Sequence, residues 1–332
     1  APGDFYSMKE KGYISALNTS EKLIGEARKL YPAMQDVVFS GDSLLGYPVS
    51  VSPKSWMVNE TKWNEMNLGD YPKTYNELFE KIEMWLNEYA ADYPEYTLAD
   101  VQQMGLNTLV LSMVEAYIHE NEASGMQLTF DTPSFREMMK CVSNNAYLLS
   151  EENEQWGMPL LTSMYLGFGT CYTDSDLNRM ILPPALDLNG KQSLYAEMSI
   201  LAVNAVSKNA EVATRFVEFC VENLSNTVRY EMEPELNEPV ESSAYYVRVA
   251  ELQGKINDLA EQLEKADQDD RYAIKEKIIQ AEAKLEQLEE RKWEIDPKSI
   301  EIYRSAAENL KVSYKSPLLL KGENGGYEAL RS

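Results

Sequence analysis

A repeat of leucine, isoleucine and alanine residues between positions 246 and 294 constrains the fold of this chain more than any other feature of its sequence. The apolar residues recur at spacings of four and three, with Glu and Lys between them, on both sides of the polar segment 267–270. This spacing predicts an antiparallel helical hairpin with a coiled-coil seam. Its role stays open between a stabilising or spacing insertion and a docking arm for a partner protein. The seam residues are Leu252, Ile256, Leu259, Leu263, Ile274, Ile278, Ala281, Leu285 and Leu288.

The remainder of the chain carries both helical and strand patterns. Thr74 followed by Glu77 predicts a capping box, and the helix that it opens has an apolar face of Leu78, Ile82, Trp85 and Leu86. Another helix is expected to start at 130–134, with its cap before Pro133. The segment 156–190 is rich in glycine, proline and aromatic residues and has little helical period. Further helices are expected over 21–30, 61–66, 99–122 and 210–224, and strands over 37–39, 44–51 and 196–206, while 56–58 is a further apolar run.

The charge of the chain excludes some classes of partner. Its 332 residues include 54 acidic and 31 basic ones, which gives a formal net charge of −23. Such a charge repels phosphate backbones and anionic lipid headgroups, so we expect no nucleic-acid partner. No run of about 18 apolar residues is present, which argues against a membrane-spanning helix.

Few of the usual catalytic residues are available. His119 is the single histidine, and the three cysteines, Cys141, Cys171 and Cys220, are far apart in apolar surroundings that favour small core residues over a disulfide. No glycine-rich phosphate loop, HExxH or GxSxG motif occurs. We therefore expect no enzyme, no metal site and no cofactor. A carboxylate-dependent glycan hydrolase is the catalytic alternative, but acidic residues are so abundant that a pair of them is uninformative.

Several short motifs follow one another in an order that is more specific than any one of them. The most telling is DSLLGYPV at 42–49, followed by VNE at 58–60 and LGDYPKTYNEL at 68–78. The others are KGYI at 11–14, YP at 31–32, FDTPSF at 130–135, AVSKNAEVATRFVEF at 205–219 and EPV at 238–240. Together they resemble the extracellular solute-binding protein family 1, the receptors of sugar-type ABC transporters. The resemblance covers most of the chain outside the hairpin.

The resemblance implies an α/β fold of the two-lobed, periplasmic-binding-protein-like type II, helix-rich, with the hairpin as an insertion. Lobe 1 would comprise residues 1–48 and 190–236, and lobe 2 residues 49–189 and 237–332, with the hairpin 246–294 inserted in lobe 2. Members of the family begin with a strand, a helix and a second strand before the segment similar to KGYI, so lobe 1 is expected to be incomplete at its N-terminus. The opening APGDF has neither an initiator Met nor a signal-peptide core, so either a leader was removed or the chain begins inside a longer gene product.

The resemblance also implies a function, a non-catalytic receptor that binds a solute in the cleft between its lobes. The solute is expected to be a mono- or oligosaccharide, delivered to the membrane permease of an ABC transporter. The receptor is expected to be a monomer, lipid-anchored at the outer face of the cytoplasmic membrane. The alternative is a structural or adaptor protein that uses its acidic surface and the hairpin for protein contacts.

The candidate ligand-binding residues are of two kinds. By the family pattern, Ser52 falls near a position that often carries a ligand-binding polar side chain, and Trp56 follows the first strand that crosses between lobes. The aromatic stretch supplies flat surfaces for the C–H faces of a sugar, and nearby carboxylates can accept its hydroxyl hydrogens. Each aromatic residue taken singly fits a core position as well. The members of this stretch are Trp156, Tyr165, Phe168 and Tyr172, with Asp174 or Asp176 as acceptors.

Overall fold

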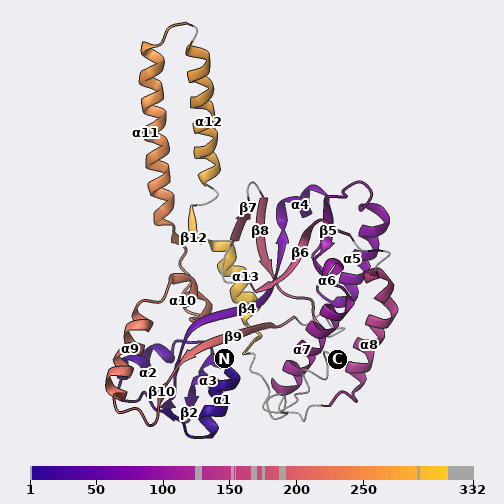
Figure 1. Ribbon diagram of the computed structural model, residues 1–332, viewed down its shortest axis with the longest axis vertical. Helices are drawn as coiled ribbons and strands as arrows, with labels where there is room; N and C mark the ends of the chain where they lie inside the picture. The colour runs from indigo at the N-terminus through magenta and orange to yellow at the C-terminus, as the bar shows by residue number, and fades with distance from the viewer. Residues whose placement is uncertain are drawn as a thin grey trace. The chain divides into compact units, whose positions relative to one another are not determined.

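The structure, a computed structural model, confirms a helix-rich α/β fold with a helical hairpin (Figure 1). It describes residues 2–123, 129–150, 153, 155–165, 170–173, 176–186, 192–268, 270–289 and 292–312. The chain divides into two compact units, one made of residues 1–236 with 301–332 and the other of residues 237–300. The lobe boundaries expected from the sequence stay a prediction.

The first helices and short strands of the large unit precede its long central strand. Ser20 caps α2, because its Oγ accepts a hydrogen bond from the Leu23 backbone N–H (3.1 Å). Pro32 is the first residue of α3, where its missing N–H costs nothing. These elements are α1 (Pro2–Glu10), β1 (Ile14–Ser15), α2 (Glu21–Ala27), α3 (Pro32–Val38), β2 (Phe39–Ser40) and β3 (Ser43–Leu44).

A mixed sheet organises the large unit around one long strand, β4 (Tyr47–Asn59). The strand order is β13-β9-β4-β6-β5, and β8 pairs with both β4 and β7. The other strands of this sheet are β5 (Tyr96–Ala99), β6 (Met158–Tyr165), β7 (Thr170–Thr173), β8 (Asp176–Ile181), β9 (Leu194–Leu201) and β13 (Leu310–Val312).

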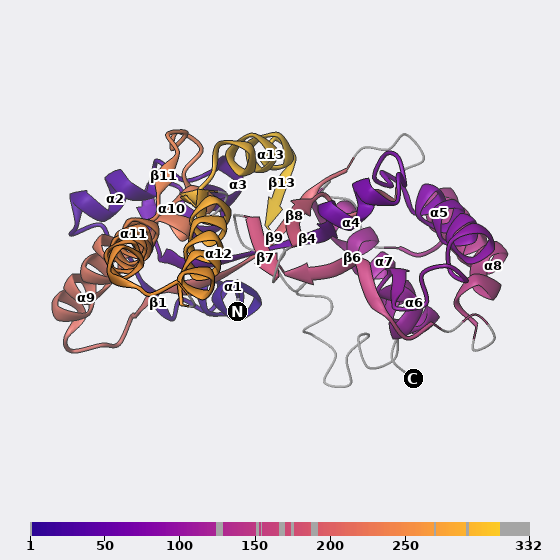
Figure 2. The same cartoon turned by 90° about the horizontal axis from the view of Figure 1, so that it is seen from above.

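The central strand changes neighbours halfway along its length. Its first part, from Tyr47 to Lys54, pairs with β9, and its last part pairs with β6 on one edge and β8 on the other. Figure 2 shows β9, β4 and β6 following one another through the unit. The strand expected over 44–51 is present from Tyr47 on, but it continues through the apolar run 56–58 as one strand that ends at Asn59. Pro48 lies at a register irregularity and Pro53 is paired with Ala196, so neither proline ends the strand.

The C-terminal part of β4 lies against a hydrophobic core built mainly from helices. Trp56, Trp63, Phe79 and Trp85 are all buried in it. The predicted cap of α5 is present, since Thr74 Oγ1 accepts from the Glu77 backbone N–H (3.2 Å), while Glu77 Oε2 accepts from Lys73 N–H rather than from that of Thr74. The helices are α4 (Glu60–Glu65), α5 (Tyr75–Glu88), α6 (Val101–Met104), α7 (Leu106–Ala123), α8 (Pro133–Asn145) and the 3-10 helix η1 (Ala146–Leu149).

Helix α8 lies beside α5 in both views (Figures 1 and 2). Its start agrees with the sequence, because Thr132 Oγ1 accepts from the Phe135 backbone N–H (3.1 Å). The Cys141 thiol of α8 donates to Asn76 Oδ1 of α5 (2.7 Å), so this cysteine is half-buried and hydrogen-bonded rather than a purely apolar core residue.

Two further expected elements differ from those observed, while the segment 156–190 lacks helical period as expected over its described residues. Val37 and Val38 belong to α3 and not to a strand, because burial of Met34, Val37 and Val38 on one helical side outweighs the strand preference of valine. The helix expected over 99–122 is two helices, α6 and α7, divided at Gly105, whose φ of +77° suits glycine. The described part of 156–190 contains the strands β6, β7 and β8.

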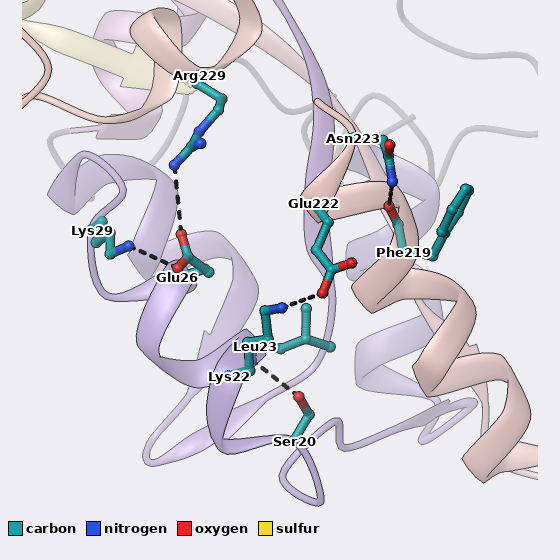
Figure 3. A network of polar contacts seen from close by, with 9 residues as sticks. All are labelled: Ser20, Lys22, Leu23, Glu26, Lys29, Phe219, Glu222, Asn223 and Arg229. Atoms are coloured by element: carbon teal, nitrogen blue, oxygen red, sulfur yellow. Dashed lines mark hydrogen bonds and ion pairs between the residues drawn. The ribbon is translucent and has the colours of Figure 1, made fainter. Parts of the chain in front are cut away.

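A polar network ties α2 to the helices after β9 (Figure 3). Lys22 pairs with Glu222, and Glu26 lies 2.7 Å from Lys29 Nζ and 3.9 Å from Arg229 Nη2. The elements of this part are β10 (Val203–Asn204), which pairs with β1, α9 (Ala210–Glu222) and α10 (Asn226–Met232). These surface pairs orient the helices more than they stabilise them.

The second unit contains the predicted hairpin. Helices α11 (Ser243–Lys265) and α12 (Arg271–Glu289) run side by side, and Leu259 and Ala281 are buried between them (Figure 1). The other seven predicted seam residues are half-buried, whereas most of their neighbours are exposed, so the predicted seam is confirmed. β11 (Val240–Glu241) and β12 (Trp293–Ile295) pair antiparallel at the base, before α13 (Pro297–Ala307) begins.

Candidate functional site

The candidate site lies where β4 exchanges its neighbours. Ser52, Lys54 and Trp56 are spaced by two, so their side chains leave the same face of the strand. Lys54 is the residue of the changeover, since it is paired with Tyr195 of β9 and with Tyr165 of β6. Two residues expected from the sequence, Ser52 and Trp56, thus lie on either side of Lys54, and a third, Tyr165, is paired with it.

A row of four residues crosses the sheet at this point. Lys311 of β13 pairs with Tyr195 of β9, Tyr195 pairs with Lys54 of β4, and Lys54 pairs with Tyr165 of β6. Residues directly opposite one another in a sheet share a face, so Lys311, Tyr195 and Lys54 lie along one line, and Tyr165, described by its backbone only, continues the register. The ring of Tyr195 is buried, and Lys311 Nζ lies 5.5 Å from its centroid, within cation–π range. We refer to Lys311, Tyr195, Lys54 and Tyr165 as the cross-strand row.

An ion pair borders the cross-strand row. Lys54 Nζ lies 3.2 Å from Glu197 Oε1, and Glu197 is paired in register with Ser52. The Lys54 side chain is 25% exposed and that of Glu197 46% exposed, so solvent reaches both. The site therefore offers an ammonium, a carboxylate, a hydroxyl and an aromatic ring within neighbouring positions of two strands.

The indole of Trp56 belongs to the core beside this site. It is buried, and its register partners are Ser163 of β6 and Ile181 of β8. Ser163 donates two hydrogen bonds of 2.8 Å to Asp100 Oδ2, from its backbone N–H and from its hydroxyl. Burial raises the pKa of the Asp100 carboxyl, and the bonds from Ser163 oppose that rise.

A buried ion pair holds the end of β4. Arg179 of β8 is paired in register with Val58, and its Nε lies 2.7 Å from Glu60 Oε2 at the start of α4. The Tyr71 hydroxyl lies 3.5 Å from Glu60 Oε1. Burial, with the Glu60 charge as a second cause, raises the pKa of Tyr71 to about 12.

The raised pKa of Tyr71 predicts a loss of stability at high pH. An unfolded tyrosine ionises near pH 10, whereas Tyr71 in the folded protein stays neutral until about pH 12. The unfolded chain therefore releases this proton first, and the free energy of unfolding falls as the pH rises from about 10 to 12. Urea unfolding at several pH values should show a smaller fall for Tyr71→Phe. Equal falls in both proteins would contradict the assignment.

The remaining residues expected from the sequence do not all lie at the cross-strand row. Trp156 is 75% exposed and precedes Met158, the first residue of β6, whereas Tyr165 is the last. The two ends of that strand are about 23 Å apart at about 3.3 Å per residue. Tyr172 is in β7 and Asp176 begins β8, where they are described by backbone only. Phe168 and Asp174 lie outside the described residues.

Four residues of this site were not expected from the sequence, namely Lys54, Tyr195, Glu197 and Lys311. Lys54 could have been found, because it alternates with Ser52 and Trp56 along one strand. Tyr195, Glu197 and Lys311 belong to strands that follow β4 by more than 130 residues. No local sequence motif specifies how those strands are placed relative to β4. Over the described ranges, no three His, Cys, Asp or Glu side chains are grouped to hold a metal ion.

Comparisons with known proteins give only distant structural neighbours. No family model and no curated protein matches this sequence. A structure titled for xylan utilization by Caldanaerobius polysaccharolyticus is 15% identical over 69% of this chain and 63% of its own, with a TM-score of 0.44. An ABC transporter solute-binding protein from Thermotoga lettingae, bound with α-D-tagatose, is 15% identical over 69% of this chain and 62% of its own, with a TM-score of 0.42. Maltose-bound MalE3 of T. maritima is 12% identical over 92% of this chain and 81% of its own, with a TM-score of 0.44.

The first two of these matches involve less than two thirds of the neighbour's length. Separately, none of the helices among the described residues combines the length and the apolar character needed to cross a bilayer.

Proposed function

We propose that this chain is a non-catalytic extracellular solute-binding receptor of an ABC uptake system, and that it binds a carbohydrate at the cross-strand row. The observation that carries the proposal is the register of Lys311, Tyr195, Lys54 and Tyr165 across adjacent strands, beside Ser52 and Glu197. The order of the sequence motifs, from KGYI to EPV, supports the same assignment.

The chemistry of the row suits a neutral hydroxylated solute. A buried sugar hydroxyl must keep its hydrogen bonds, and an ammonium, a carboxylate and a serine hydroxyl supply both donors and acceptors. Lys54, Glu197 and Ser52 provide these polar functions within two paired strands, beside the buried ring of Tyr195.

Two long paired strands suit a receptor that closes around its ligand. In this proposal β4 and β9 are the strands that cross between lobe 1 and lobe 2, and the cross-strand row lies where β4 leaves β9 for β6 and β8. Hinge closure about such strands would bury the solute. A permease partner, a lipid anchor at the outer face of the membrane and a monomeric state complete the proposal.

A ligand screen with site variants tests the proposal. Neutral mono- and oligosaccharides are screened by thermal shift, and isothermal titration then gives the Kd of each hit. A binding sugar should lose about tenfold or more in affinity for Lys54→Met, because a hydrogen bond to a charged group is removed. Trp156→Ala should leave the Kd unchanged. Absence of any hit would contradict the receptor, and loss of binding in Trp156→Ala alone would move the site to the other end of β6.

The same titration separates a receptor from an adaptor. Deletion of residues 246–289 removes most of α11 and all of α12 but keeps the paired strands β11 and β12, with which the hairpin forms a compact unit. A receptor should keep its sugar affinity, whereas an adaptor that works through the hairpin would bind no sugar before or after the deletion.

A further inference from the structure

The charges at the cross-strand row are unusual for this chain. In a protein with a formal net charge of −23, two lysines, Lys54 and Lys311, lie in one line across three strands. Their backbones are about 10 Å apart, at about 4.8 Å per strand spacing, and two positive charges on one face would attract a carboxylate or phosphate group. The carboxylate of Glu197 pairs with one of them, at 3.2 Å from Lys54 Nζ.

Glu197 has Ser52 as its register partner on β4, in addition to its ion pair with Lys54. It stands opposite Ser52, two rungs of the ladder away from the pairing of Lys54 with Tyr195 and on the same face. The ion pair is therefore diagonal, and it draws the Lys54 ammonium along the strands toward Ser52. Since nearly half of the Glu197 side chain is exposed, a solute at the row would meet a carboxylate as well as an ammonium.

We propose that Glu197 is the charge-selecting residue of this site: it holds the Lys54 ammonium and excludes acidic sugars in favour of neutral ones. The inference rests on the proposed carbohydrate-binding function and adds the class of sugar that the site admits. A uronic acid would bring its carboxylate against that of Glu197, and like charges in one site repel. A neutral sugar can instead donate a hydroxyl hydrogen to Glu197 and accept one from Lys54.

The substitution Glu197→Gln separates charge from shape. Glutamine has nearly the same size and keeps one oxygen acceptor, but it removes the negative charge and releases the Lys54 ammonium from the ion pair. Because solvent screens this pair, the expected gain in affinity for a uronate is roughly fivefold. The gain should shrink as salt is added, since it is electrostatic.

The experiment uses the full chain and two matched pairs of sugars, D-galactose with D-galacturonate and D-glucose with D-glucuronate, together with neutral oligosaccharides that the screen identifies. Isothermal titration compares the wild type, Glu197→Gln and Glu197→Asp at about 0.03 M and at about 0.5 M salt. The electrostatic screening length is roughly four times shorter at the higher concentration. We expect the uronate-to-neutral affinity ratio to rise for Glu197→Gln and not for Glu197→Asp, which keeps the charge.

A control variant tests whether any lost carboxylate has the same effect. Glu211→Gln removes a charge from an exposed ion pair with Arg215 on α9 (2.7 Å), outside the row, and should leave the affinity ratio unchanged. If neutral sugars bind and Glu197→Gln does not change the ratio, charge selection is refuted while the proposed receptor stands. If no neutral sugar binds any of these proteins, the proposed function fails and this inference fails with it.

Discussion

Replacement of Arg179 by methionine should lower the free energy of unfolding by about 3–5 kcal/mol, because it removes the buried cation that balances the Glu60 carboxylate. The two side chains are 10% and 14% exposed, and Arg179 Nε lies 2.7 Å from Glu60 Oε2. Arg179 also stands opposite Val58 of β4 and Thr170 of β7, so its loss weakens the attachment of the β7–β8 hairpin to the central strand.

Urea unfolding followed by circular dichroism measures this effect. The double variant Glu60→Met with Arg179→Met should recover part of the loss, since apolar side chains of similar volume can replace a buried ion pair. The matched control is Arg215→Met, which breaks an ion pair whose side chains are 72% and 79% exposed and should cost less than about 1 kcal/mol. A cost as small for Arg179→Met would show that the buried pair contributes nothing.

The second large effect is expected for Trp85→Ala, at about 3–5 kcal/mol, because truncation of a fully buried tryptophan leaves a large cavity. Trp85 is completely buried in the helical core. Its ring stacks on Tyr89, with centroids 5.7 Å apart and planes 5° from parallel. Its Nε1 donates a hydrogen bond to Oε1 of Gln155 (2.9 Å). Gln155 precedes Trp156 and strand β6 in the sequence.

Thermal and urea unfolding of a short series separates these contributions. Trp85→Phe keeps an aromatic ring but loses the hydrogen bond, so its cost should fall between those of the wild type and Trp85→Ala. Gln155→Leu removes only the acceptor, which should cost about 1 kcal/mol. If Trp85→Ala were no more destabilising than Gln155→Leu, packing of this ring would not support the core.

The helices could largely be predicted from the sequence because their signals are local. The caps at Thr74 and Thr132 each form within four residues of chain. The hairpin seam also depends on spacing within single helices. The errors arose where burial competes with local preference, as at Val37 and Val38, or where a proline sits inside a strand, as at Pro53. Neither outcome is decided by adjacent residues alone.

The candidate site was less predictable, because it depends on register between distant strands. The family pattern directed attention to Ser52 and Trp56, and β4 places them on either side of Lys54. Glu197 approaches Lys54 only through the pairing of β4 with β9, and Lys311 requires the further parallel pairing of β13 with β9. A one-residue shift of either register would turn these side chains to the opposite face.

The two ends of the hairpin meet at the paired strands β11 and β12, so the hairpin can be changed as a self-contained insertion. Because Val240 is paired with Ile295 and Glu241 with Trp293, the polypeptide leaves and returns at nearly the same place. Its length can therefore vary in evolution or by engineering without pulling the flanking segments apart. One extra heptad in each helix would lengthen the projection by about 10 Å, at about 1.5 Å per residue. The hairpin is therefore a suitable attachment site for a fluorophore or a tether.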